Sequence, residues 1–143
     1  MIALLLVPAA LQAAAMAADE GYFHRRRGLP RWERRGHPID TLSVAIAYAY
    51  LALASPTTTH AEIFALIAFA SCVIVTKDEP IHARLCTAGE HWLHAILFVL
   101  HPIVFACFAA LWWQHVTTPI ALQLALTIAF GLYQITYWRD RQS

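Results

Sequence analysis

Carboxylates and imidazoles are concentrated in one stretch, residues 77–102, which reads KDEPIHARLCTAGEHWLHAILFVLHP. Several of its acidic residues and histidines are three or four positions apart, as in Glu79–His82 and Glu90–His94. A mixed set of Asp, Glu and His side chains suits iron, manganese or zinc, and it needs no thiolate. The stretch therefore predicts a metal site.

Helical periodicity places these side chains on common faces. Residues separated by three, four or seven positions lie on one face of an α-helix, so Glu90, His94 and His101 are expected to form one stripe. Glu20 and His24 have the same four-residue spacing near the N-terminus. Two distant parts of the chain thus carry ligand pairs of the same kind.

The Glu79–His82 pair has the spacing E-x-x-H, which resembles the motif of ferritin-like di-iron proteins and membrane alternative oxidases. Those families use two copies, and this sequence has one. His91 and His94 have the H-x-x-H spacing, which resembles part of the histidine boxes of membrane desaturases and hydroxylases. Both resemblances suggest iron chemistry without assigning a family.

The elements that must position these residues are predicted to be membrane-spanning helices. Hydrophobic residues make up 59% of the 143 residues and charged residues only 13%, which is far from the composition of an ordinary soluble domain. Net charge is +1, which gives no case for nucleic-acid binding. We predict an all-α, five-helix membrane bundle forming a single domain over residues 1–143, with spans near residues 1–19, 39–55, 60–77, 90–113 and 118–138. S/T-x-x-E capping boxes are expected at Thr59–Glu62 and Thr87–Glu90.

Basic residues predict the orientation of the bundle. In the five-span arrangement all 10 lysines and arginines fall on one side: Arg25, Arg26, Arg27, Arg31, Arg34, Arg35, Lys77, Arg84, Arg139 and Arg141. Positive charge marks the cytoplasmic side. The N-terminus is therefore expected outside, the C-terminus in the cytoplasm, and the chain in the inner (cytoplasmic) membrane as a multi-pass protein.

On this topology most acidic residues and histidines converge at the cytoplasmic membrane face. The expected metal ligands are Glu20, His24, Asp78, Glu79, His82, Glu90, His94 and His101. His101, the deepest of them, is expected either to bind the metal or to fix a ligand, and Asp40 is a further candidate. Each residue alone also has an ordinary structural explanation, such as helix capping by Glu90 or a surface ion pair for Glu33.

Two classes of function remain open from the sequence. The favoured one is a small membrane metalloenzyme with iron, in the fullest case two irons, that oxidises, hydroxylates or desaturates a lipid-like substrate with electrons from an external donor. A zinc-dependent membrane hydrolase is the alternative within the enzyme class, and manganese also fits the ligands. A non-enzymatic proton or metal-ion transporter, or an accessory subunit, is the other class. The sequence assigns no catalytic residue and leaves the oligomeric state, including a homo-oligomer, open.

Overall fold

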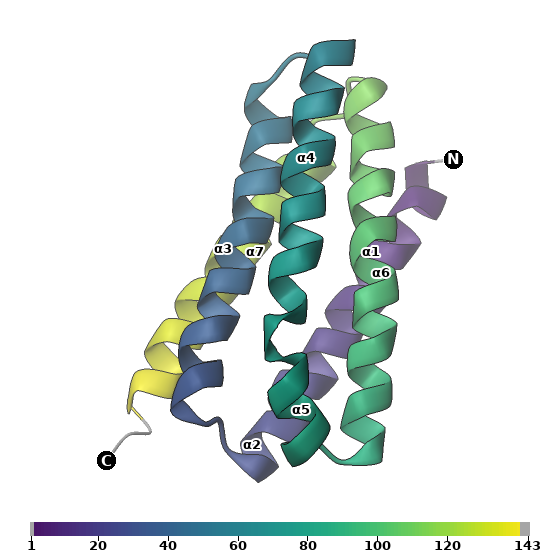
Figure 1. Cartoon of the computed structure of the whole chain (residues 1–143). Helices are drawn as coiled ribbons and strands as arrows, with labels where there is room; N and C mark the ends of the chain where they lie inside the picture. The colour runs from purple at the N-terminus through teal and green to yellow at the C-terminus, as the bar shows by residue number, and fades with distance from the viewer. Residues whose placement is uncertain (1, 141–143) are drawn as a thin grey trace.

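The computed structural model describes residues 2–140, without the side chain of Asp140, and all regular secondary structure in this range is helical (Figure 1). Met1 and Arg141 therefore lie outside the described residues. In chain order the elements are α1 (Ile2–Ala18), the π-helix η1 (Asp19–His24), α2 (Arg25–Arg27), α3 (Arg31–Leu53), α4 (Thr58–Ile74), the 3₁₀ turn η2 (Val75–Asp78), α5 (Glu79–Leu85), α6 (Ala88–Trp113) and α7 (Thr118–Asp140).

Local sequence signals explain where these helices begin and end. Gly28 has a φ of +75°, a conformation that suits glycine, and it ends α2. The Thr87 hydroxyl accepts a hydrogen bond from the Glu90 backbone N–H at 3.3 Å and caps α6, which is one half of the predicted capping box, while the Glu90 carboxylate bonds to Arg27. At α4 the capping residue is Thr57, which accepts from the His60 N–H at 3.2 Å, so the prediction of a cap at Thr59 was wrong by two positions.

The helices form a bundle in which segments far apart in sequence are neighbours (Figure 1). Helix α3 packs between α7 and α4, and α6 packs against α1 and α4. One end of this bundle holds α2, α5 and the start of α3, and the other holds the connections between α3 and α4 and between α6 and α7.

Among the described residues, four helical segments are long and apolar enough to cross a membrane, whereas five were predicted. They are Ile2–Arg27, Thr58–Leu85, Ala88–Trp113 and Thr118–Arg139. The segment that differs is α3, which begins at Arg31 and carries Glu33, Arg34, Arg35 and Asp40 in its first half. Its apolar part, residues 41–53, is shorter than the roughly 17 residues that a spanning helix needs.

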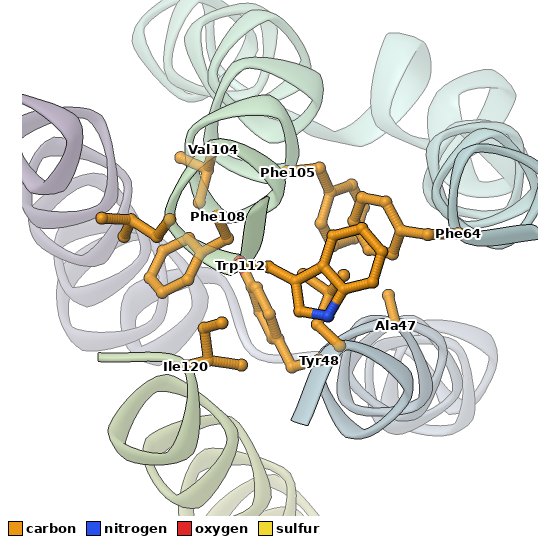
Figure 2. Close-up of a cluster of buried hydrophobic side chains, with 10 residues drawn as sticks. Ala47, Tyr48, Phe64, Val104, Phe105, Phe108, Trp112 and Ile120 are labelled. Carbon is orange, nitrogen blue, oxygen red and sulfur yellow. The ribbon is translucent and has the colours of Figure 1, made fainter. Parts of the chain in front are cut away.

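A cluster of large apolar side chains fills the interior of the bundle (Figure 2). It lies toward the end opposite to α2 and α5 (Figure 1). Tyr48 of α3 packs against Phe105 and Phe108 of α6, with ring centroids 5.6 and 5.0 Å apart, and Phe64 of α4 meets Phe105 edge to face. Trp112 closes this cluster and donates its indole N–H to the Ala54 carbonyl at 2.8 Å. This packing fixes α3, α4 and α6 relative to one another, and it therefore sets the positions of their polar ends.

Candidate metal centre

The candidate site lies at the end of the bundle where η1, α3, α5 and α6 meet. We call its members the histidine–carboxylate cluster, and they are Asp19, Glu20, His24, Glu33, His37, His82, Cys86, Glu90 and His94. Four separate chain segments contribute to it, so the cluster forms only when the bundle is assembled.

The π-helix η1 supplies the N-terminal part of the cluster. A π-helix has i→i+5 hydrogen bonds, and such single turns are frequent at functional sites. Here this geometry brings two carboxylates to one imidazole: His24 Nε2 lies 3.2 Å from Asp19 Oδ2, and His24 Nδ1 lies 3.2 Å from Glu20 Oε2. Glu20 also accepts the indole N–H of Trp138 from α7, which holds its carboxylate in place.

A first group of potential ligands joins η1 to α6. Asp19, His24, Glu90 and His94 each offer one donor atom, and all four atoms lie within 4.8 Å of one another. The two oxygens of Asp19 divide between two rings, because Oδ1 lies 3.2 Å from His94 Nε2 while Oδ2 faces His24. Glu90 Oε1 is 3.9 Å from His24 Nε2. Two carboxylates and two imidazoles of this kind suit iron, manganese or zinc.

A second group joins α3 to α5 and shares no residue with the first. It consists of Glu33, His37 and His82, again with donor atoms within 4.8 Å. His82 Nε2 is 3.9 Å from Glu33 Oε1. The two groups are adjacent, since the His82 and His94 ring centroids are 4.3 Å apart and those of His24 and His37 are 4.8 Å apart.

Two further groups connect these sets. Glu20, His24 and His37 form one, and His82, Cys86 and His94 form the other. Each draws histidines from both of the disjoint groups. Donor atoms are therefore continuous across the cluster, and an ion in either group would have alternative ligands within reach.

Several imidazole nitrogens in the cluster have no hydrogen-bond partner among the described residues. Both ring nitrogens of His82 and Nδ1 of His94 are buried and unpaired, while each histidine as a whole is only 6% exposed. A buried polar atom without a partner costs about 1–3 kcal/mol. An ordered water or a metal ion could supply the partner, and the neighbouring carboxylates are ligands of the kind a metal ion binds.

Arg27 is the positive charge that the chain itself places between the two groups. Its guanidinium lies 2.7 Å from Glu33 Oε2 and 3.0 Å from Glu90 Oε1. The side chains of Glu33 and Glu90 are 0% and 1% exposed, so each needs a cation nearby. Arg27 thus pairs with one carboxylate from each group.

Burial keeps two potential ligands outside the apolar spans, His37 and Cys86, in their neutral forms. Burial holds the pKa of His37 well below its usual value of 6.5, and the positive charge of neighbouring histidines and Lys77 acts in the same direction. His37 is therefore neutral at pH 7 and keeps a lone pair for a metal. Burial also raises the pKa of the Cys86 thiol to about 12, so Cys86 stays protonated unless a metal binds it.

Five of the residues predicted as ligands meet in the cluster: Glu20, His24, His82, Glu90 and His94. Asp78, Glu79 and His101 lie outside its groups of donor atoms. Asp78 accepts from the Trp32 indole at 2.6 Å and from Lys77 at 2.9 Å. Glu79 is at the rim, 3.4 Å from His91. Asp40 binds Lys77 at 2.6 Å.

His101 belongs to a separate polar layer inside the bundle. Its Nδ1 lies 3.3 Å from the Gln12 amide nitrogen and its Nε2 lies 3.2 Å from the Ser71 hydroxyl, which in turn lies 2.8 Å from the Ser43 hydroxyl. Both ring nitrogens of His101 therefore have partners. These contacts join α1, α6, α4 and α3.

The cluster also contains residues that the sequence analysis did not select: Asp19, Glu33, His37 and Cys86. Asp19 and His24 are five residues apart, which an α-helix places on different faces and a π-helix brings together. Glu33 and His37 do have the four-residue spacing of Glu20 and His24, and that signal was available. Cys86 likewise lies four residues after His82, so that signal was also available, and the fold then brings this pair to His94.

No protein-family model, no curated protein and no solved structure matches this chain. Fold and site together define an all-helical protein with apolar helices compatible with a membrane, and with buried His, Asp and Glu groups that could hold a metal ion.

Proposed function

We propose that this protein is a small membrane metalloenzyme whose histidine–carboxylate cluster binds two metal ions, with iron as the favoured metal. The observation that carries the proposal is the pair of disjoint ligand groups, Asp19/His24/Glu90/His94 and Glu33/His37/His82. Because they share no residue, both groups can bind an ion at once. The unpaired nitrogens of His82 and His94 support the same proposal.

The proposed reaction is oxidation, hydroxylation or desaturation of a lipid-like substrate. Iron held by histidines and carboxylates supplies oxygen activation, and the chain's own residues hold and orient it. A substrate that reaches a site at the end of membrane helices is itself apolar, such as a fatty acyl chain, an isoprenoid or a quinone. Reducing equivalents would come from an external donor.

We further propose that α3 crosses the inner (cytoplasmic) membrane as a fifth span. Its packing between α7 and α4 supports this, and two acidic residues of its first half are paired inside the chain, Glu33 with Arg27 and Asp40 with Lys77. The N-terminus would then lie outside, and the cluster would lie at the cytoplasmic membrane face together with the arginines.

Metal content of the detergent-purified protein, measured by elemental mass spectrometry, tests the proposal. We expect about two irons per chain in the wild type. His94→Ala should remove the ion of the first group and His37→Ala that of the second. His60→Gln is the matched control, because His60 pairs with Tyr50 at 2.7 Å outside the cluster. His101→Gln should also keep both irons.

Other outcomes of this measurement would overturn parts of the proposal. A single ion lost in both His94→Ala and His37→Ala would mean one shared site in place of two. A wild type without metal, prepared without chelators, would overturn the enzyme and leave a transporter or an accessory subunit.

A zinc-dependent hydrolase is the second candidate, and Cys86 is the observation that favours it. Cys86 shares a ligand group with His82 and His94, and zinc is the metal that binds cysteine sulfur and histidine nitrogen together in proteins. One zinc per chain, lost in Cys86→Ser, would select this function. Iron that persists in Cys86→Ser would exclude it.

A further inference from the structure

A cavity of about 560 Å³ lies between the start of α3 and the end of α7, outside the histidine–carboxylate cluster. The two segments run side by side at the end of the bundle that carries the C-terminus (Figure 1). Arginines dominate its wall: Arg31, Arg34, Arg35 and Arg139.

Three of these arginines carry positive charge that no carboxylate in the described part of the chain neutralises. Arg27 pairs with Glu33 and Glu90, whereas Arg31, Arg34 and Arg35 form no ion pair with any described side chain. Guanidinium groups present fixed forks of N–H donors that match phosphate and carboxylate oxygens. Several of them around one cavity form a site for an anion.

Gln134 provides a second, independent feature of the site. It is only 5% exposed and lines the cavity, and its Oε1 accepts a hydrogen bond from the Thr41 hydroxyl at 2.7 Å. That bond fixes the orientation of the amide. Its Nε2 has no partner among the described residues and remains able to donate to a ligand.

Apolar side chains complete the wall of the cavity. Pro38 and Ile135 line it, and Ile135 is 51% exposed on the surface of α7. A purely ionic ligand would gain nothing from these contacts. An amphiphile would place its charged group among the arginines and its chain along Ile135, at the level where basic residues meet lipid head groups.

We infer that this cavity binds the phosphate group of a membrane amphiphile, such as a phospholipid or a polyprenyl phosphate. A phosphate ester accepts several charge-assisted hydrogen bonds at once, so it matches Arg31, Arg34, Arg35 and the Gln134 amide better than a single carboxylate does. The inference goes beyond the proposed metal chemistry and does not need a metal. Trp138 is the common element, since it lines the cavity and donates to Glu20 of the cluster.

Native mass spectrometry of the detergent-solubilised protein, titrated with dioctanoyl phosphatidic acid, tests the inference. We expect saturable one-to-one binding. The double variant Arg34→Gln/Arg35→Gln should weaken it by about tenfold or more, since two charge-assisted contacts are lost. Gln134→Leu should weaken it severalfold without any change of charge.

The control is Arg84→Gln/Arg26→Gln, which removes the same charge from residues outside the cavity. Circular dichroism and metal content, unchanged in all variants, would show that the fold is intact. Equal weakening in the control would reduce the effect to bulk charge and overturn the site. Competition by inorganic phosphate at the same concentration as phosphatidic acid would overturn the assignment to an amphiphile.

Discussion

At the scale of single residues, the cluster contains an imidazole that stays neutral in its environment. His37 is the clearest example, because burial holds its pKa well below 6.5. An unfolded chain gives the same histidine its ordinary pKa of about 6.5. At this residue the folded state therefore binds fewer protons than the unfolded state in the range below pH 6.5.

This difference predicts the pH dependence of the metal-free protein. The contribution of His37 to the free energy of unfolding is fully present above pH 6.5. It falls as the pH drops below 6.5, by up to about 1.4 kcal/mol per pH unit. Chemical unfolding in detergent with a chelator, from pH 8 to pH 5, measures it. His37→Gln should flatten the curve, and an unchanged slope in that variant would contradict the assignment.

Arg27 gives a second prediction at this scale, because it balances the charge of Glu33 and Glu90. Removing one partner of a buried ion pair costs about 3–5 kcal/mol. Arg27→Gln should therefore lower the stability of the metal-free protein strongly. A bound metal would supply positive charge to the same carboxylates, so the metal-loaded variant should lose much less.

Thermal unfolding of Arg27→Gln with and without iron measures this difference. Arg26→Gln is the matched control, since Arg26 is exposed and bonds only to Tyr22 among the hydrogen bonds described. An equal loss of stability with and without iron would show that the metal does not bind beside Glu33 and Glu90.

At the scale of elements, the π-helix η1 decides which side chains reach the cluster. Its wider turn places both Asp19 and Glu20 beside His24. Deletion of one residue in such a turn returns the segment to an ordinary α-helix. Gly21 is a suitable position for this deletion because it also offers a control substitution: a Cβ added at Gly21 would meet no atom within 4 Å.

Deletion of Gly21 should therefore separate Asp19 from His24 and remove the ion of the first ligand group. Gly21→Ala is the control: it keeps the chain length, should retain the metal, and should stabilise the helix by about 0.5–1 kcal/mol. The iron content of the two variants measures whether the π-helix is needed for metal binding. Full iron content after the deletion would show that the π-helix is not needed for binding.

At the scale of the whole molecule, α3 determines how many times the chain crosses the membrane. Four segments qualify as spans by length and composition, and α3 does not because of its charged first half. Its place between α7 and α4 nevertheless predicts that it crosses with them. In that case residues 54–57 and residue 84 lie on opposite sides.

Labelling of single introduced cysteines tests this topology in cells, in a background without Cys72, Cys86 and Cys107. Ser55→Cys should react with a membrane-impermeant maleimide from outside, and Arg84→Cys should react only after lysis. Both positions are exposed. Protection of Ser55→Cys until lysis would show that α3 stays on the cytoplasmic side.

The sequence alone determined the helical class, the apolar segments and five members of the cluster. These follow from local rules: composition defines a membrane helix, and spacing places Glu90 and His94, or Glu20 and His24, on one face. The cap at Thr87 was predictable for the same reason, since its partner is three residues away.

Only the tertiary structure decided how these faces combine. Asp19 reaches His24 through a π-helix, and the pair His82 and Cys86 meets His94 only in the folded chain. His101 lies outside the cluster, and its two ring nitrogens contact Ser71 and Gln12, which are distant in sequence. Such pairings depend on which helices are neighbours. The periodicity of a helix predicts which side chains share a face, but it does not predict which other helix that face contacts.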